Sequence, residues 1–201
     1  PFGVLAAIAM GTVCGLISGT LIARMKIPPF IATLGMMLIL KGLSLVISGT
    51  KPIYFNDTPS FPLLSTGSLI GGVIPGLPVP NGVVILFVLA LIISWVLNRT
   101  VLGRYCFALG SNEEAVRLSG VNADGWKVAI YALAGGICGI AGLLIASRLN
   151  SAQPALGLGY ELDAIAAVVI GGTSLAGGRG SILGTIIGAL IMSVLLNGLR
   201  I

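Results

Sequence analysis

The sequence contains no histidine and very few charged residues. Asp, Glu, Lys and Arg make up only 8 % of its 201 residues, whereas a soluble domain has about 25 %. The absence of histidine removes the commonest metal ligand and general base from the chain. The three cysteines, Cys14, Cys106 and Cys138, are far apart and form neither a metal-binding spacing nor a disulfide framework. We therefore expect no metal site and no cofactor.

Apolar residues dominate what is there. They make up 56 % of the chain, and the mean hydropathy is +1.09. A water-soluble body of this size cannot bury so much apolar surface, so the sequence predicts a protein whose solvent is the lipid bilayer. The net charge of +5 is small and unevenly placed, which argues against nucleic acid as a partner. Because the chain starts at Pro1 without a methionine and stops at Ile201 after an apolar run, we expect a fragment.

The apolar residues are gathered into long runs. A helix that crosses the bilayer needs about 20 mainly apolar residues. The runs that reach or approach this length are residues 3–23, 30–49, 82–98, 127–146, 161–177 and 181–198. Backbone groups must be satisfied within the segment in lipid, and the pattern is not the alternating one of a barrel. The sequence therefore predicts an all-α, polytopic integral membrane helical bundle with about six membrane segments. The last two runs are so close that they could form a tight hairpin or two half-helices.

Lys and Arg are unevenly distributed over the connections between these runs. Connections 24–29, 99–127 and 176–181 carry Arg24, Lys26, Arg99, Arg104, Arg117, Lys127 and Arg179. The alternate connections carry Lys51 and Arg148, and Arg200 stands at the end of the chain. The positive-inside rule then predicts that the first three connections lie in the cytoplasm and that Lys51–Asn81 lies outside.

Glycines recur at spacings of four inside the apolar runs. The sets are Gly11, Gly15 and Gly19, then Gly135 and Gly139, then Gly184 and Gly188. In lipid this spacing lets helix backbones approach closely. We interpret these glycines as packing positions rather than as parts of a binding site.

One segment of the apolar chain, GSNEEAVRLSGVNADGWK (110–127), is polar and charged. Ser111 and Glu114 have the S-x-x-E spacing of a capping box, which predicts that a helix begins there. Glu113 and Glu114 suit the positive end of the helix dipole, and Gly120 stands where a left-handed C-terminal cap is expected. The segment therefore predicts a short helix of about two turns over residues 112–119.

So short a helix is marginal unless it docks on something. Ala115, Leu118 and Ser119 lie three and four residues apart and form a narrow face of small and apolar side chains. This face could pack on the protein's own membrane domain or on a partner. A plain connector lying on the membrane surface is the simplest alternative, and the residues alone leave the choice open.

Three stretches of the sequence resemble one family of membrane proteins. They are PPFIATLG (28–35), LGRYCFALGSNEEAVRLSGVNADGWK (102–127) and NSAQPALGLGYELDAIAAVVIGGTSLAGG (150–178). The second contains the family's G-x-N-x-x-A-x-x-x-S-G pattern at Gly110, Asn112, Ala115, Ser119 and Gly120. The stretches resemble the permease subunits of bacterial ABC importers for monosaccharides, the ribose, xylose and galactose group, and most closely the ribose permeases.

This resemblance implies a fold, a location and partners. Residues 1–201 would form a single transmembrane permease domain of the bacterial inner membrane, without the family's N- and C-terminal helices. The implied partners are ABC ATPase subunits, a periplasmic sugar-binding protein and a second permease copy. ATP would be hydrolysed on the separate ATPase, so the chain itself is expected to be a transport subunit and not an enzyme.

The resemblance also implies a role for the polar segment. In the family, a short cytoplasmic helix docks in a groove of the ATPase and couples nucleotide-driven closure to the membrane helices. Carried over to this chain, the ATPase-coupling residues are Gly110, Ser111, Asn112, Glu113, Glu114, Ala115, Arg117, Leu118, Ser119 and Gly120.

A second glycine-rich stretch, GGTSLAGGRGS (171–181), invites comparison with a phosphate-binding loop. The P-loop pattern needs Lys and then Ser or Thr after its last Gly, and it follows a strand. Counted from Gly172, this chain has Gly178 and Arg179 there, and the stretch follows an apolar helical run. We therefore interpret the glycines as a tight turn with close packing.

Four charged residues are candidates for the transport path or for contact with the sugar-binding protein: Lys41, Arg148, Glu161 and Asp163. Lys41 lies within an apolar run, where charge is costly and points to function, although it is close enough to the outer end to extend its amine to the interface. Glu161 and Asp163 begin a run, where the helix dipole stabilises carboxylates. Arg148 could pair with one of them.

Two other functional classes compete with an ATP-driven importer. A secondary sugar transporter driven by an ion gradient favours acidic residues within the membrane and broken repeats, and the sequence shows neither persuasively. A membrane-embedded enzyme needs a nucleophile with a base, and the missing histidine argues against that class.

Overall fold

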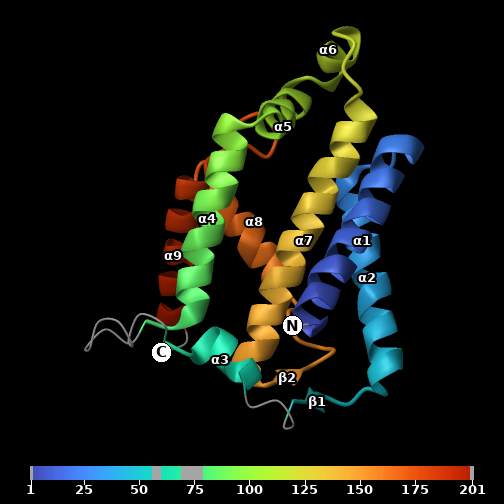
Figure 1. The fold of residues 1–201 in the computed structure, drawn as a ribbon. Helices are drawn as coiled ribbons and strands as arrows, with labels where there is room; N and C mark the ends of the chain where they lie inside the picture. The colour runs from blue at the N-terminus through green and yellow to red at the C-terminus, as the bar shows by residue number, and fades with distance from the viewer. Residues whose placement is uncertain (1, 56–59, 69–78, 200–201) are drawn as a thin grey trace. The chain divides into compact units, whose positions relative to one another are not determined.

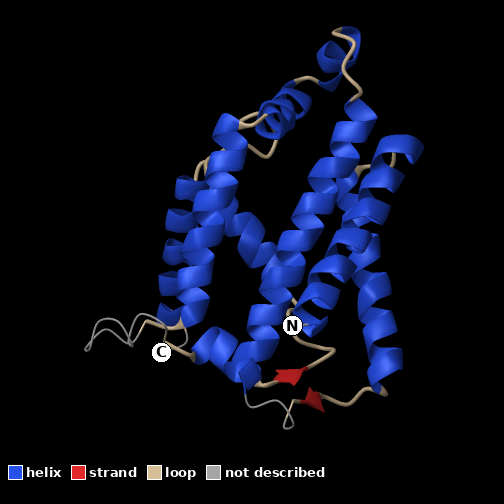
Figure 2. Ribbon diagram, in the orientation of Figure 1, coloured by secondary structure: helices blue, strands red, loops and turns tan. Residues whose placement is uncertain are grey.

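The computed structural model describes residues 2–55, 60–68 and 79–199. This part of the chain is almost entirely helical, with two very short strands (Figure 2). Its helices are α1 (Phe2–Met25), α2 (Pro29–Ser48), α3 (Ser60–Thr66), α4 (Asn81–Arg99), α5 (Val101–Ser111), α6 (Glu113–Leu118), α7 (Ala123–Leu149), α8 (Tyr160–Ile170) and α9 (Ile182–Gly198). The strands are β1 (Ile53–Tyr54) and β2 (Ser151–Ala152).

A helix stands at each of the six apolar runs, and four of these helices are long enough to cross a membrane. They are α1, α2, α4 and α7, of 24, 20, 19 and 27 residues. Few of the residues in these helices are buried inside the chain, and none of the residues of α4 is buried. A helix that is hydrophobic all round and exposed belongs in lipid. The predicted class, an all-helical polytopic membrane protein, is confirmed.

The chain forms two compact units, which we describe separately. Unit 1 comprises Pro1–Leu89 and Asp124–Ala155, and unit 2 comprises Ala90–Ala123 and Leu156–Ile201.

The centre of unit 1 is the contact between α1 and α7, which lie side by side (Figure 1). Gly11 faces Gly135 and Gly139, and Gly15 faces Tyr131, so closely that a Cβ on either α1 glycine would collide with α7 backbone. Rising numbers on α1 meet falling numbers on α7, so the two helices are antiparallel. The predicted role of this glycine stripe, close helix packing in lipid, agrees with the structure.

At the end of unit 1 where α2 and α7 stop, hydrogen bonds join the segments that come after them. β1 pairs antiparallel with β2, with Ile53 opposite Ala152. The Ser147 side chain is fully buried; its Oγ donates to the Phe61 carbonyl oxygen at 2.7 Å and accepts from the Ser65 amide at 3.1 Å. These bonds fix α3 to the last turn of α7, a connection between residues far apart in sequence.

In unit 2, α8 and α9 pack as an antiparallel pair. Gly171 contacts Gly184, and Gly188 contacts the Ala167 carbonyl, with no room for a Cβ on the glycines. The predicted run 161–177 is wrong in its end, because α8 stops at Ile170 and residues 171–181 form the turn. A helix of 11 residues is about 16 Å long and cannot cross the bilayer alone. The pair is thus a hairpin with one short arm.

Candidate functional site

The polar connection between α4 and α7 contains a helix that the sequence analysis did not predict. Val101–Ser111 forms α5, and the Thr100 hydroxyl caps it by accepting from the Gly103 amide at 3.5 Å. The signal was present in the sequence as a Thr directly before an amphipathic stretch. The segment was not recognised as a helix because it is short and carries the basic residue Arg104, like the polar connection around it.

The predicted capping box of the next helix is wrong by one residue. Ser111 is the last residue of α5, and Asn112 is the N-cap of α6, with its Oδ1 accepting from the Ala115 amide at 3.0 Å. Asn112 has the extended backbone expected of a cap, with φ −157° and ψ 100°. Among the described residues, the Glu114 carboxylate makes no reciprocal bond. Because α5 extends through Ser111, the cap of α6 is Asn112 and not Ser111.

The other end of α6 agrees with the prediction. Gly120 has φ +81°, the left-handed conformation that glycine adopts without strain. The Ser119 and Gly120 amides donate to carbonyl oxygens of the helix. Glu113 and Arg117, one turn apart, form an ion pair at 3.0 Å. Both side chains are substantially exposed, so the pair stabilises the helix by only a few tenths of a kcal/mol.

The faces of α6 differ in exposure. Val116 is buried, with 8 % of its surface accessible, and anchors the helix. Leu118 is 84 % exposed, and Ala115 and Ser119 beside it are also exposed. The face predicted from spacing is therefore free of the rest of the described chain.

The glycine-rich turn 171–181 lies against the end of α5. A Cβ on Gly177 would be 2.5 Å from the Gly110 carbonyl oxygen, and a Cβ on Gly178 would be 2.9 Å from the Ser111 Cβ. Both glycines have positive φ, +87° and +75°. The interpretation of these glycines as a tight turn with close packing is confirmed. The turn meets the base of α6 at its joint with α5.

The four charged residues predicted for the path lie in different places. Lys41 is half-buried on α2, and Arg148 is exposed on the last turn of α7, both in unit 1. Glu161 and Asp163 lie in the first turn of α8 in unit 2. The Glu161 carboxylate accepts from the Gly159 amide at 3.1 Å, which is the helix-end stabilisation expected of it. A pairing of Arg148 with either carboxylate stays a prediction.

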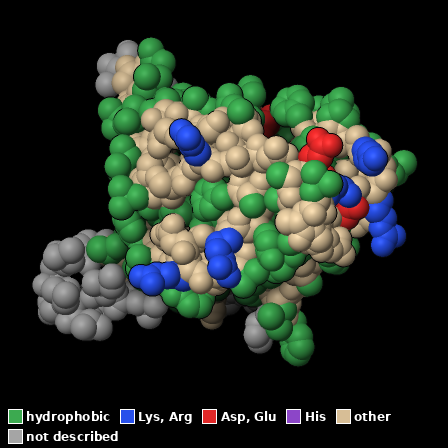
Figure 3. Space-filling model, turned by 90° about the horizontal axis from the view of Figure 1, so that it is seen from above, with side chains coloured by type: hydrophobic (Ala, Val, Ile, Leu, Met, Phe, Trp, Pro, Cys, Tyr) green, Lys and Arg blue, Asp and Glu red, His purple; other side chains and the backbone are tan. Residues whose placement is uncertain are grey.

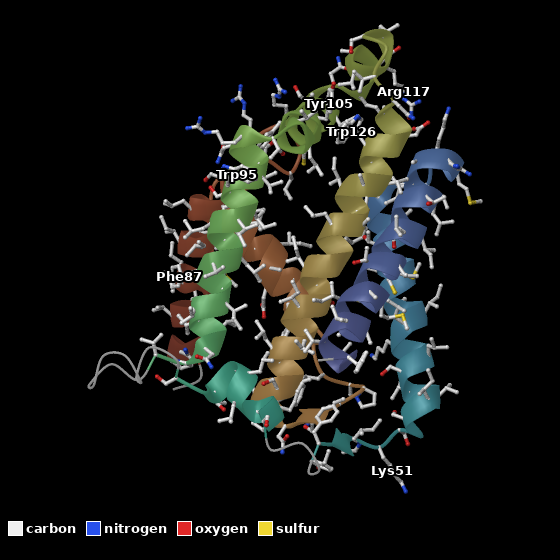
Figure 4. The ribbon with its side chains drawn as sticks, viewed as in Figure 1. Lys51, Phe87, Trp95, Tyr105, Arg117 and Trp126 are labelled. Atoms are coloured by element: carbon white, nitrogen blue, oxygen red, sulfur yellow. The ribbon has the colours of Figure 1, made fainter. Side chains whose placement is uncertain are left out.

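Within each unit, several basic residues that are far apart in sequence lie at a shared end. Because α1 and α7 are antiparallel, Arg24, Lys26 and Lys127 share one end of unit 1, and Lys51 and Arg148 the other. In unit 2, the turn that carries Arg179 packs on α5, which carries Arg104. Figure 3 shows Lys and Arg side chains, in blue, scattered among hydrophobic side chains, in green, and backbone and other side chains, in tan. In Figure 4, Arg117 lies on α6 and Lys51 follows α2.

The chain matches a known family along its full length. The family model described as "Branched-chain amino acid transport system / permease component" matches residues 1–201. The ribose import permease protein of Escherichia coli (strain K12) is 46 % identical over 198 residues, covering 98 % of this chain and 60 % of that protein. The corresponding protein of Bacillus subtilis (strain 168) is 48 % identical over 186 residues, covering 92 % and 55 %.

A fructose import permease protein of Rhizobium meliloti is also similar, at 41 % identity over 202 residues, covering 98 % of this chain and 55 % of that protein. The chain thus spans 55 to 60 % of the length of these curated relatives. No solved structure gives a significant match.

Proposed function

The chain belongs to this permease family, and on that premise we propose that it is the membrane-spanning subunit of an ATP-driven importer of a monosaccharide, ribose or a similar sugar. The support for a sugar is the set of relatives, which are import permeases for ribose and fructose by name. The support for an ATP-driven mechanism is the short capped helix α6, which exposes an apolar face.

The location does not depend on the choice of sugar. Family membership and four helices long enough to span a bilayer make the chain a multi-pass protein of the inner membrane. The predicted class and location are confirmed. The partners we propose are an ATPase subunit, a periplasmic sugar-binding protein and a second permease copy. ATP hydrolysis belongs to the ATPase.

The observation that carries the coupling role is the exposure of Leu118 on α6. The helix is fixed at its start by Asn112, at its end by Gly120 and on its inner side by Val116. Such a helix holds its exposed face in one orientation, as docking into a groove requires. The proposed ATPase-docking face comprises Ala115, Leu118 and Ser119, with the other residues of 110–120 as its support.

The test of this role places a charge on the docking face. Leu118→Asp should fold and insert, because the side chain is exposed, but it should co-purify less ATPase, because the ATPase would then desolvate a carboxylate. Ala115→Trp should act in the same way through bulk. Leu63→Asp is the matched control, since Leu63 is an exposed leucine of the short helix α3 in the other unit. Normal ATPase recovery with both docking-face variants would refute the coupling role.

The energy source is tested separately. In proteoliposomes that contain the permease with its ATPase, and to which the sugar-binding protein is added, ribose uptake should require ATP and should persist when ionophores collapse the ion gradients. Uptake that follows an ion gradient without ATP would instead identify a secondary transporter.

A further inference from the structure

The turn between α8 and α9 makes a contact that neither its own helices nor the docking face requires. Gly177 approaches the Gly110 carbonyl oxygen, and Gly178 approaches Ser111. The contact is reciprocal, because a Cβ on Gly110 would lie 2.7 Å from the Gly178 amide nitrogen. Backbone therefore meets backbone with no side chain between them. Contact of this kind leaves little room for one segment to move without the other.

The turn itself is internally braced. The Ser174 amide donates to the Arg179 carbonyl oxygen at 3.0 Å, and the Gly177 amide donates to the Ser174 carbonyl oxygen at 3.1 Å. A Cβ on Gly180 would lie 2.8 Å from Thr173 Cγ2, so the two arms of the turn also touch. Beyond the turn, the glycine contacts between α8 and α9 continue the close packing. A displacement of the turn is thus a displacement of the helix pair.

On the other side of the contact lies the joint between α5 and α6. Asn112, with its extended backbone, is the one residue between the two helices. Gly110 and Ser111 form the last turn of α5 immediately before it. A push on α6 therefore reaches the end of α5 after a single residue, and the turn is packed at that point.

We propose that Gly177 and Gly178 are positioning residues that hold the turn against the α5–α6 joint, so that movement of α6 is transmitted to the α8–α9 pair. This inference rests on the proposed coupling role of α6. All of its contacts lie within unit 2. It assigns a mechanical role to a motif that has no phosphate-binding chemistry, and it identifies α8–α9 as the membrane element driven from this site.

The experiment compares glycines that share a backbone conformation but differ in what surrounds them. Gly177→Ala and Gly178→Ala place a Cβ into the contact. Gly172→Ala is the matched control, because Gly172 has φ +85° in the same turn with nothing near its Cβ position. In all three variants the alanine must adopt a left-handed backbone conformation, which costs each of them a similar free energy. A reciprocal variant, Gly110→Ala, enters the contact from α5 without that cost, and Gly42→Ala on α2, in open space, is its control.

The complex of the permease with its ATPase is reconstituted and supplied with the sugar-binding protein. Sugar taken up per ATP hydrolysed is then measured together with ATPase co-purification. Gly177→Ala and Gly178→Ala should retain the ATPase but lower uptake per ATP by about 2- to 30-fold, the range of couplings carried through packed residues. Gly110→Ala should lower the same ratio, whereas Gly172→Ala and Gly42→Ala should match the unaltered chain.

Three results would overturn the proposal. The same ratio in Gly177→Ala and Gly178→Ala as in Gly172→Ala would show that the contact transmits nothing. Loss of membrane insertion in these two variants, with Gly172→Ala still inserted, would make the contact a folding requirement only. Loss of the ATPase itself would make the turn part of the docking surface. Failure of the coupling role is recognised independently, by normal ATPase recovery with Leu118→Asp.

Discussion

Asn112 shows how much of the site depends on a single side chain. It ends α5 and begins α6, and its Oδ1 satisfies the Ala115 amide. Asn112→Ala should remove about 0.5–2 kcal/mol of helix stability. Hydrogen exchange of the α6 amides should then accelerate by about 2- to 30-fold, since exchange follows local opening.

Two variants separate this cap from the capping box that the sequence suggested. Ser111→Ala and Glu114→Ala should accelerate the exchange of α6 amides less than Asn112→Ala does, because neither side chain caps α6 in the structure and Glu114 acts only through the helix dipole. Faster exchange in Glu114→Ala with slow exchange in Asn112→Ala would restore the capping box and contradict the structure.

Cys106 provides a second prediction at this scale. It lies on α5, outside the membrane-spanning helices, and burial raises the pKa of its thiol above the ordinary value. Burial disfavours the charged thiolate, which is the form that reacts with maleimides. Its labelling rate should therefore rise with pH at a higher midpoint than that of a cysteine placed at exposed Glu114 in a Cys106→Ala chain. Coincident midpoints would contradict the raised pKa.

At the scale of elements, prediction from sequence succeeded where long apolar runs decide the outcome. Each of the six runs contains a helix, because an apolar segment in lipid must satisfy its backbone hydrogen bonds within itself. Prediction failed where several short signals compete over a few residues. The turn that begins at Gly171 and Gly172 ended the helix of the fifth run at Ile170 instead of at residue 177.

The candidate site was predictable in part for the same reason. The exposed face of α6 followed from the spacing of Ala115, Leu118 and Ser119, and Gly120 followed from the need for a left-handed end. The contact between residues 110–111 and 177–178 could not be predicted, because it joins backbones some 65 residues apart in sequence and no side-chain pattern marks such a pair. Only the folded chain brings the two glycine groups together.

For the molecule as a whole, the distribution of basic residues predicts the orientation of the chain in the membrane. Within each unit the structure brings basic residues predicted to be cytoplasmic to a shared end. The positive-inside rule predicts that these ends lie on the cytoplasmic side, and this sets the direction in which each span crosses the membrane. The cysteines that report on orientation must replace exposed residues that the structure describes. Asp57, which the sequence would suggest for the outer side, lies outside the described residues. Lys51 on the loop after α2 serves instead.

Single cysteines at Glu114, Leu175 and Lys51 test this orientation in a chain whose native cysteines are replaced by alanine. All three positions are exposed. Glu114→Cys and Leu175→Cys, on the polar connections of unit 2, should react with a membrane-impermeant maleimide only in inside-out vesicles. Lys51→Cys should react only in right-side-out vesicles, because an odd number of spans separates it from α6 when α4 crosses the membrane between them. Labelling of Lys51→Cys and Glu114→Cys from the same side would show that α4 does not cross, and the positive-inside assignment would fall with it.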